Sequence, residues 1–547
     1  MKKSGQLAVI ILWVTVLFAF NGLGQTRSYK IGYELSMPNP ASHLFEVKMN
    51  IETPTVEESI NLQMPRWSPG RYAVVDFAKG VQEVKVSTAC SGKISNCQTI
   101  SLAAIRMDTQ TWQFKPNKTK KFVVTYKVFA NNLSGTFSQL DERHANYNGG
   151  TIFMYVVNHK QDPVELKITP PSNWKIINGR MVRADQTDWK FDNYDILIDT
   201  PTEIAPDWTV DEFQVDGKLY RVMVHSFGDE GGKRPQFVKD VEKIVRAETL
   251  MMPAPDYDSY TFIFHFAPKN ETGGDGMEHL TSTQIIETDT MASKDGYEGA
   301  LSTAAHEFFH VWNVKRLRPV GLGPWDFTQP VTTRGLFIAE GFTNYYGKMM
   351  QQRSGVWTDR QLIDSYSRTI TLIENSPGSK LISAVESSVI APFLDRASRV
   401  QNTNLAATTF SYYPKGELIA LTLDLMIRKR SNGKKSLDDV MRAAYDEFYV
   451  KSPKNTYYLK GRGYTVEDFE NLTTQVTKAN MSDFFFKYVH GVEVPPYDEG
   501  LAFVGLKLTR IDSTRPSGEK FTEFKIEELP NVSSETLARR RAWLNGK

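Results

Sequence analysis

The chain has 547 residues, of which 41% are hydrophobic and 23% are charged, an ordinary balance for a folded protein. This length is too great for one hydrophobic core, so we expect several domains. The formal net charge is only +2, which gives no electrostatic reason to expect nucleic acid or an anionic membrane as a partner.

The beginning of the chain has the pattern of a secretory signal peptide. Lys2 and Lys3 supply positive charge, the apolar run Leu7–Phe20 follows, and Gly22 and Gly24 are small residues at a cleavage site. The apolar run is shorter than a comfortable membrane span, so an uncleaved anchor is the less favoured alternative. We expect an exported protein, periplasmic or secreted, with residues 1–24 as the signal and no stable membrane span after its removal.

Residues 25–227 read as an N-terminal β domain. Phe45–Ile51 alternates apolar and polar residues, and Lys121–Phe129 is also strand-like, whereas helical periodicity is scarce. This pattern predicts a β-sandwich-like domain, and no local cluster of His, Cys or carboxylates in it predicts chemistry. Cys90 and Cys97 are the only cysteines; export permits a disulfide between them, and we interpret them as structural.

Residues 228–494 change in character and read as a catalytic domain. An amphipathic helix over Phe237–Met252 is followed by strands over Tyr260–Phe266 and Thr281–Ile286. From Glu298 onward helical patterns dominate, which predicts a mixed strand-helix lobe leading into a helical lobe. The whole chain is therefore expected to be multidomain α+β. The further helices predicted are Leu301–Asn313, Leu336–Gln352, Leu418–Arg428, Leu437–Val450 and Met481–Val489.

Two histidines four residues apart, His306 and His310, lie in an apolar helix-forming stretch. At 3.6 residues per turn both imidazoles project from one face and can bind the same metal ion. Glu307, beside the first histidine, can then accept the proton of an attacking water. The alternative for the motif alone is a pair of histidines packed in the core.

A catalytic zinc needs a third protein ligand and one open position. The best candidate is Glu340, the one acidic residue of the apolar helical segment Leu336–Tyr346. A carboxylate buried among apolar neighbours is costly unless it is paired or bound to metal.

These residues resemble a known family. His306-Glu-Phe-Phe-His-Val-Trp-Asn-Val-Lys-Arg-Leu-Arg-Pro319, followed by Ala339-Glu-Gly-Phe-Thr-Asn-Tyr-Tyr346, looks like the glycyl aminopeptidase family of gluzincins, and Met64-Pro-Arg-Trp-Ser-Pro-Gly-Arg-Tyr72 matches a stretch typical of its N-terminal domain. The resemblance implies a thermolysin-like catalytic domain with one Zn²⁺ per chain. It further implies His306, His310 and Glu340 as ligands, Glu307 as catalytic base, and a preference for N-terminal glycine or alanine.

Two further motifs agree with this resemblance. Glu278, in Gly276-Met-Glu-His279, resembles the exopeptidase motif in which a glutamate holds the free α-amino group; an ordinary edge-strand glutamate is the alternative. Tyr413, in Tyr413-Pro-Lys-Gly416, resembles the tyrosine that stabilises the oxyanion, although the neighbouring Tyr412 could take that role. For the basic residues Lys315, Arg316 and Arg318 we expect salt bridges rather than substrate contacts.

The sequence thus predicts an exported zinc aminopeptidase acting on peptides with a free N-terminus. The alternatives are a zinc endopeptidase on the same scaffold and a non-catalytic exported protein that binds peptides or glycans. Many members of the family carry a PDZ domain, but residues 495–547 are too few for a complete one, so we expect only an extension there. No sequence feature indicates an oligomeric state.

Overall fold

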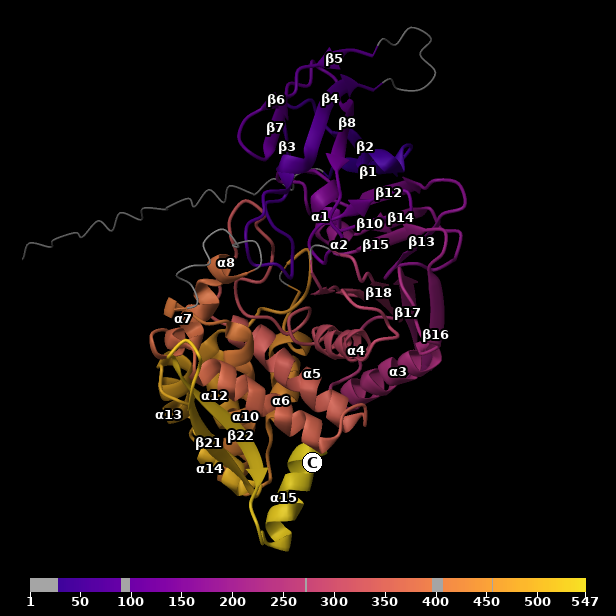
Figure 1. Cartoon of the computed structure of the whole chain (residues 1–547). Coiled ribbons are helices and arrows are strands. Elements are labelled where there is room, and N and C mark those ends of the chain that lie inside the picture. Colours follow the sequence, from indigo (N-terminus) through magenta and orange to yellow (C-terminus); the bar gives the residue numbers. More distant parts are fainter. Residues whose placement is uncertain (1–27, 90–98, 271–272, 396–406, 455) are drawn as a thin grey trace, which may run out of the picture.

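The computed structural model describes residues 28–89, 99–270, 273–395, 407–454 and 456–547. The predicted signal peptide and both cysteines lie outside these residues. Within them, no helix is both long enough and apolar enough to span a bilayer. Figure 1 shows the N-terminal sheets at one end of the molecule, the helical region toward the other end, and α4 (Lys294–Phe309) between them.

The N-terminal region is rich in β-structure, as predicted. Its largest sheet has seven strands, and alternate residues of the central strands are buried because successive side chains point to opposite faces. In sheet order the strands are β14 (Asp188–Phe191), β12 (Val164–Thr169), β1 (Lys30–Ser36), β2 (Leu44–Glu52), β8 (Lys121–Phe129), β4 (Val81–Thr88) and β5 (Ser101–Leu102).

Two smaller sheets pack against this large sheet, so the layer opposite it is divided. The Phe45 ring contacts Tyr147 at a centroid separation of 6.3 Å, and the Phe122 ring contacts Phe114 at 5.1 Å. One sheet has the order β13 (Lys175–Asn178), β15 (Thr202–Ala205), β10 (Ala145–Tyr147) and β9 (Gln139–Leu140). The other has the order β11 (Tyr155–Val156), β3 (Ile60–Gln63), β7 (Thr111–Phe114) and β6 (Ile105–Arg106).

A separate five-stranded sheet begins the second half of the fold. Its order is β16 (Thr209–Val215), β17 (Lys218–Ser226), β18 (Ser259–Phe266), β20 (Ser282–Glu287) and β19 (Asp275–Glu278). Strands β17, β18 and β20 run parallel, and α3 (Arg234–Met251) connects β17 to β18. Because β16 and β17 pair in this sheet, the structural division falls after β15, earlier than the predicted boundary at residue 227. Strand pattern alone does not reveal which sheet a strand joins.

Helices make up most of the remaining chain. The predicted segment Leu336–Gln352 consists of a π-helix, Phe337–Phe342, that continues into α5 (Thr343–Arg353). The α-helices that follow are α6 (Asp359–Glu374), α7 (Ala384–Val389), α8 (Ala391–Leu394), α10 (Tyr412–Arg430), α11 (Leu437–Tyr445), α12 (Val466–Thr477) and α13 (Ser482–Phe484). The π-helices Asp446–Val450 and Phe485–His490 continue α11 and α13.

The C-terminal extension packs on this helical region. It contains α14 (Tyr497–Phe503), the hairpin β21 (Leu506–Thr514) and β22 (Lys520–Glu528), and α15 (Ser534–Leu544). The backbone N–H of Phe524 donates to Thr371 Oγ1 of α6 at 3.0 Å, and the indole of Trp543 donates to the Tyr345 hydroxyl of α5 at 3.3 Å. The extension is thus part of the helical core.

Candidate active site

Helix α4 carries the two candidate histidine ligands on its last turn. It begins at Lys294 because Ser293 caps it, its hydroxyl accepting from the N–H of Gly296 at 2.9 Å. His306 lies on the helix and His310 is its C-terminal cap. The separation of their Nε2 atoms is 3.0 Å, so both imidazoles point to one place, as their spacing predicts.

Glu340 lies on the π-helix and faces both histidines. Its Oε2 is 3.4 Å from His306 Nε2 and 3.3 Å from His310 Nε2. Atoms each bound about 2.0–2.2 Å from a tetrahedral zinc would lie roughly 3.3–3.6 Å apart, so both distances to Glu340 fit this ion, and the two histidine nitrogens at 3.0 Å are slightly closer. Burial opposes charge on His310, but Glu340 outweighs burial and raises the His310 pKa to about 10.

Asn313, which is fully buried, joins the two segments that carry these ligands. Its carbonyl oxygen accepts from His310 Nδ1 at 2.7 Å, which fixes the tautomer and leaves Nε2 for the ion. Its side-chain amide donates to the carbonyls of Ile338 and Ala339 at 2.9 and 3.1 Å. A π-helix is a rare, locally widened turn found often at functional sites, and here these contacts hold it against the end of α4.

Tyr413 reaches the site because two backbones approach unusually closely. A Cβ on Gly341 would lie 2.3 Å from Gly416 Cα, and a Cβ on Gly416 would lie 2.1 Å from the Phe337 carbonyl oxygen. Only glycine permits this contact between the π-helix and α10. The contact places the first turn of α10, with Tyr412 and Tyr413, beside the candidate ligands.

Of these two tyrosines, Tyr413 is the one against His306. The two rings are stacked with centroids 6.1 Å apart, whereas the Tyr412 ring packs edge-on against Tyr72. Burial raises the pKa of the Tyr413 phenol well above its usual range, and Glu340 raises it further. The phenol therefore keeps its proton at neutral pH and can donate a hydrogen bond.

Glu278 comes from the edge strand β19 and faces the same site. Its Oε1 is buried, makes no hydrogen bond, and lies 3.8 Å from Lys315 Nζ. Together with Glu307 and His310 it forms a group of buried side chains whose nearest donor atoms lie within 4.8 Å of one another. The alternative for Glu278 is an ordinary glutamate of an edge strand. It does lie on an edge strand, but its carboxylate faces inward toward His310.

Glu307 is held between α4 and β19. A Cβ on Gly276 would lie 2.3 Å from Glu307 Oε1, so glycine is needed where the strand crosses this carboxylate. Burial raises the pKa of Glu307 well above its usual range; His310 opposes this shift, and the nearby Glu278 adds to it. A carboxylate with a raised pKa is suited to taking up and releasing protons near neutral pH.

The N-terminal region also contributes to the site, which its sequence pattern did not indicate. The Tyr72 hydroxyl donates a short hydrogen bond to Glu340 Oε1. Arg71 is buried and pairs with Asp275 at 3.0 Å and with Asp395 at 2.9 Å. Both residues belong to the stretch Met64–Tyr72 that resembles the family.

Lys315 is part of a buried ion pair, as expected for the basic cluster. Its ammonium is 3.0 Å from Asp199 Oδ1, and Asp199 also accepts from His279 Nδ1 at 3.1 Å. Burial raises the pKa of Asp199, but Lys315 and then His279 outweigh it and lower the pKa from 3.8 to about 2. Because the folded pKa is the lower one, the pair stabilises the protein above about pH 4, and this contribution is lost as the pH falls toward 2.

Lys315→Met is expected to lower the free energy of unfolding at pH 7 by about 3–5 kcal/mol, because Asp199 remains buried without its cation. The loss should shrink on acidification, since Asp199 can then become neutral. Urea denaturation at several pH values measures both effects. Lys190→Met is the control, because Lys190 pairs with Glu165 on the surface with side chains 83% and 66% exposed. An equal, pH-independent change in both variants would contradict the assignment.

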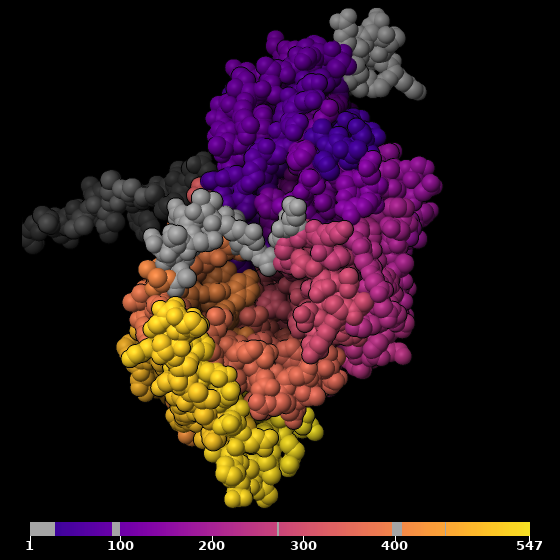
Figure 2. Space-filling model, in the orientation of Figure 1, coloured from indigo at the N-terminus to yellow at the C-terminus, as the bar shows by residue number. Residues whose placement is uncertain are grey.

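The candidate residues line one pocket of about 310 Å³. The face drawn in Figure 2 is hollowed between the pink atoms on its right and the orange atoms on its left. The pocket is lined by Gly70, Arg71, Asp275, Gly276, Glu278, His306, Glu307, His310, Glu340, Leu394, Asp395, Ser411, Tyr412 and Tyr413. The structure thus brings all six sequence-predicted site residues together.

Comparisons with known proteins agree with this geometry. Residues 32–206 match the model of the peptidase M61 N-terminal domain, and residues 299–419 match that of M61 glycyl aminopeptidase. A crystal structure of an aminopeptidase N family protein from Idiomarina loihiensis is 27% identical with a TM-score of 0.79, covering 90% of this chain and 81% of that one. A comparison with functionally curated proteins gives no match.

A more distant likeness concerns the fold alone. An M1 zinc metallopeptidase variant from Deinococcus radiodurans is 12% identical with a TM-score of 0.50, covering 86% of this chain and 96% of that one. Fold and site together define a peptidase of the metallo-aminopeptidase class. The chain belongs to the M61 glycyl aminopeptidase family.

Proposed function

We propose that this protein is an exported zinc aminopeptidase that removes small residues, glycine or alanine, from the N-terminus of peptides. The observation that carries the proposal is the inward-facing carboxylate of Glu278, in the same pocket as Glu307 and the His306, His310 and Glu340 donor set. A carboxylate in that position binds the substrate ammonium and so sets the cleavage position one residue from the free end.

His306, His310 and Glu340 would hold the zinc ion. When bound, zinc supplies Lewis acidity that polarises the scissile carbonyl and acidifies the attacking water. Glu307 accepts the proton of that water and delivers it to the leaving amine. Tyr413 donates a hydrogen bond to the oxyanion that develops, and Glu278 holds the α-ammonium group. The thermolysin-like character of the catalytic domain is part of this proposal.

The preference for small residues is supported by the restricted pocket. Its volume is about 310 Å³, near the lower end for ligand pockets, and the buried side chains of Arg71 and Tyr412 line it. Export is supported by the signal-like pattern at the beginning of the chain.

Glycine and alanine anilides, compared with their N-acetylated forms, test the proposal. We expect the free forms to be hydrolysed much faster than the N-acetylated forms, because acetylation removes the charge that Glu278 binds. Equal hydrolysis of blocked and free substrates would indicate an endopeptidase. No hydrolysis by protein that contains zinc would indicate a non-catalytic binding protein. Leucine anilide tests residue preference, and it should be the poorest substrate of the three.

Tyr72→Phe is expected to weaken zinc binding about 10–100-fold, because Glu340 loses the hydrogen bond that orients it. Zinc affinity is measured by competition with a chelator. Tyr413→Phe is the matched control: it removes a hydroxyl from the same pocket and should lower kcat about 10²-fold or more while leaving zinc affinity unchanged. Identical zinc affinity in Tyr72→Phe and the natural protein would exclude this role.

A further inference from the structure

A second group of potential metal ligands lies away from the active-site pocket. It comprises His144, Glu203, His225 and His265, whose relative exposures are 0%, 0%, 2% and 0%. His144 immediately precedes β10 and Glu203 lies in β15, both in the N-terminal region. His225 and His265 are register partners on the parallel strands β17 and β18. The group therefore joins two different sheets.

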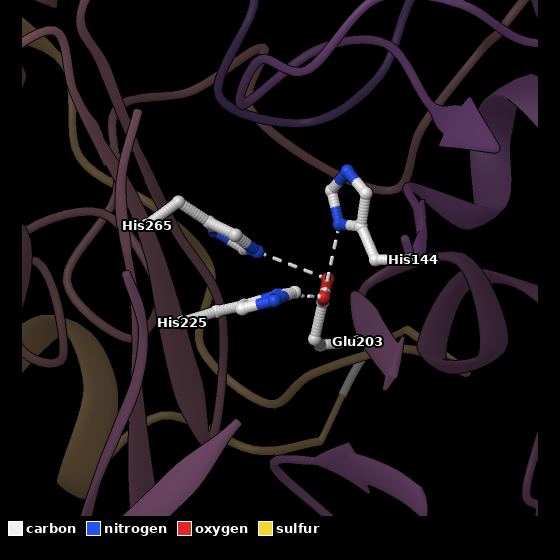
Figure 3. Close-up of side chains that lie close together, drawn as sticks. All are labelled: His144, Glu203, His225 and His265. Carbon is white, nitrogen blue, oxygen red and sulfur yellow. Dashed lines mark hydrogen bonds and ion pairs between the residues drawn. The ribbon is translucent and has the colours of Figure 1, made fainter. Parts of the chain in front are cut away.

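The three imidazoles converge on one carboxylate (Figure 3). His144 Nδ1 is 3.0 Å and His225 Nδ1 is 2.7 Å from Glu203 Oε1, and His265 Nε2 is 2.9 Å from Oε2. One donor atom from each of the four residues lies within 4.8 Å of all the others. Three imidazole nitrogens and a carboxylate oxygen are a donor set that zinc favours.

The outer nitrogens of two rings already have acceptors. His144 Nε2 is 3.0 Å from Gln139 Oε1, and His225 Nε2 is 3.1 Å from Asp207 Oδ1. A neutral imidazole has one N–H, so a ring that donates outward presents a lone pair inward. The inner nitrogens, which are Nδ1 of His144 and Nδ1 of His225, would then carry no proton. Each would direct a lone pair at a lone pair of a Glu203 oxygen. Such contacts are repulsive unless positive charge lies between them.

The orientation of Gln139 supports this proton assignment. Its amide nitrogen lies 3.4 Å from Asn131 Oδ1, an acceptor, so its oxygen faces His144. Only His265 can meet Glu203 as an ordinary neutral donor, since its Nδ1 has no hydrogen-bond partner. A divalent cation among the four side chains would replace both of these lone-pair contacts with ligand bonds.

The geometry suits a single cation. The rings of His144 and His225 are only 5.3 Å apart, so their inner nitrogens can reach the same ion as Glu203. A cation would bond to all four donors, as in closed structural sites. Glu203 is further oriented by Asn146, whose amide donates to Oε2 at 3.0 Å, and such outer hydrogen bonds are typical of metal ligands.

We propose that His144, Glu203, His225 and His265 form a second, structural zinc site that fastens the N-terminal β region to the five-stranded sheet. All four positions are supplied by the protein and the group is buried, so the site has no position for substrate. The expectation of one zinc per chain, which considered only the active site, then becomes two.

Zinc content of the full chain, measured by mass spectrometry after exhaustive dialysis, tests the proposal. We expect about two zinc ions in the natural protein and about one in His310→Ala. His265→Gln should also retain about one and still hydrolyse substrate, and the double variant should retain none. His159→Gln is the matched control with unchanged zinc content, because His159 is a partly buried histidine of the N-terminal region that pairs with Asp162 at 2.8 Å.

Cobalt provides a second measurement that does not depend on counting. Co²⁺ added to metal-depleted His310→Ala should give visible d–d absorption from the second site, and the same addition to the double variant should give none. One zinc in the natural protein, with none in His310→Ala, would overturn the proposal; so would unchanged zinc content in folded His265→Gln. One zinc that is kept in His310→Ala but lost in His265→Gln would support this site while refuting the catalytic one.

Discussion

Glu307→Gln is expected to reduce kcat on glycine anilide by about 10³-fold or more while leaving zinc content unchanged. Glutamine has nearly the same shape as glutamate but cannot accept the proton of the attacking water. Steady-state kinetics and metal analysis on the same preparation measure the two quantities together.

Glu287→Gln is a matched control for this experiment. Glu287 is partly buried beside α4, 3.4 Å from Thr303 Oγ1, and burial raises its pKa to about 7, but it does not line the pocket. Its substitution should change kcat by less than about twofold. If Glu307→Gln kept more than a tenth of the natural activity, Glu307 would not be the base.

Glu278→Gln is expected to lower kcat/KM for substrates with a free amino group by about 10²-fold. Loss of one partner of a desolvated charge pair costs about 2–5 kcal/mol, and each 1.4 kcal/mol is tenfold. Hydrolysis of N-acetylated substrates should not fall, because these substrates have no ammonium group to lose. The ratio of the two kcat/KM values is therefore the decisive measurement.

A parallel fall for blocked and free substrates would show that Glu278 supports the pocket without recognising the ammonium group. Lys315→Met serves here as a comparison, because it alters the surroundings of Glu278 at a distance of 3.8 Å without removing its carboxylate. It should retain the preference for a free amino group even if its stability is reduced.

The parts of the site that depend on local spacing could be predicted from the sequence. His306, Glu307 and His310 follow from helical periodicity, and Glu340 from being an isolated carboxylate in an apolar segment. Glu278 and Tyr413 could be proposed only by resemblance, because their approach to the histidines depends on glycine contacts across different elements. Helix α4 begins at Lys294, earlier than the predicted Leu301, because Ser293 caps it.

Contacts between distant segments could not be predicted from one sequence. Tyr72 and Glu340 are 268 residues apart, and nothing in the N-terminal strand pattern indicates that its tyrosine meets a ligand of the other half. The four residues His144, Glu203, His225 and His265 show the same limit. Each is a single residue beside or within a strand, and only the pairing of the sheets brings them together.

The hydrogen bond from Tyr72 to Glu340 has a consequence for modularity. The half of the molecule that carries the peptidase motif does not form the whole active-site pocket. Residues 64–72 of the N-terminal region supply part of its wall. A fragment starting after β15 would lack Tyr72 and would also leave the carboxylates of Asp275 and Asp395 without Arg71. A chimaera that takes its catalytic half from a relative should therefore be active only when it also takes the segment of that relative that corresponds to residues 64–72.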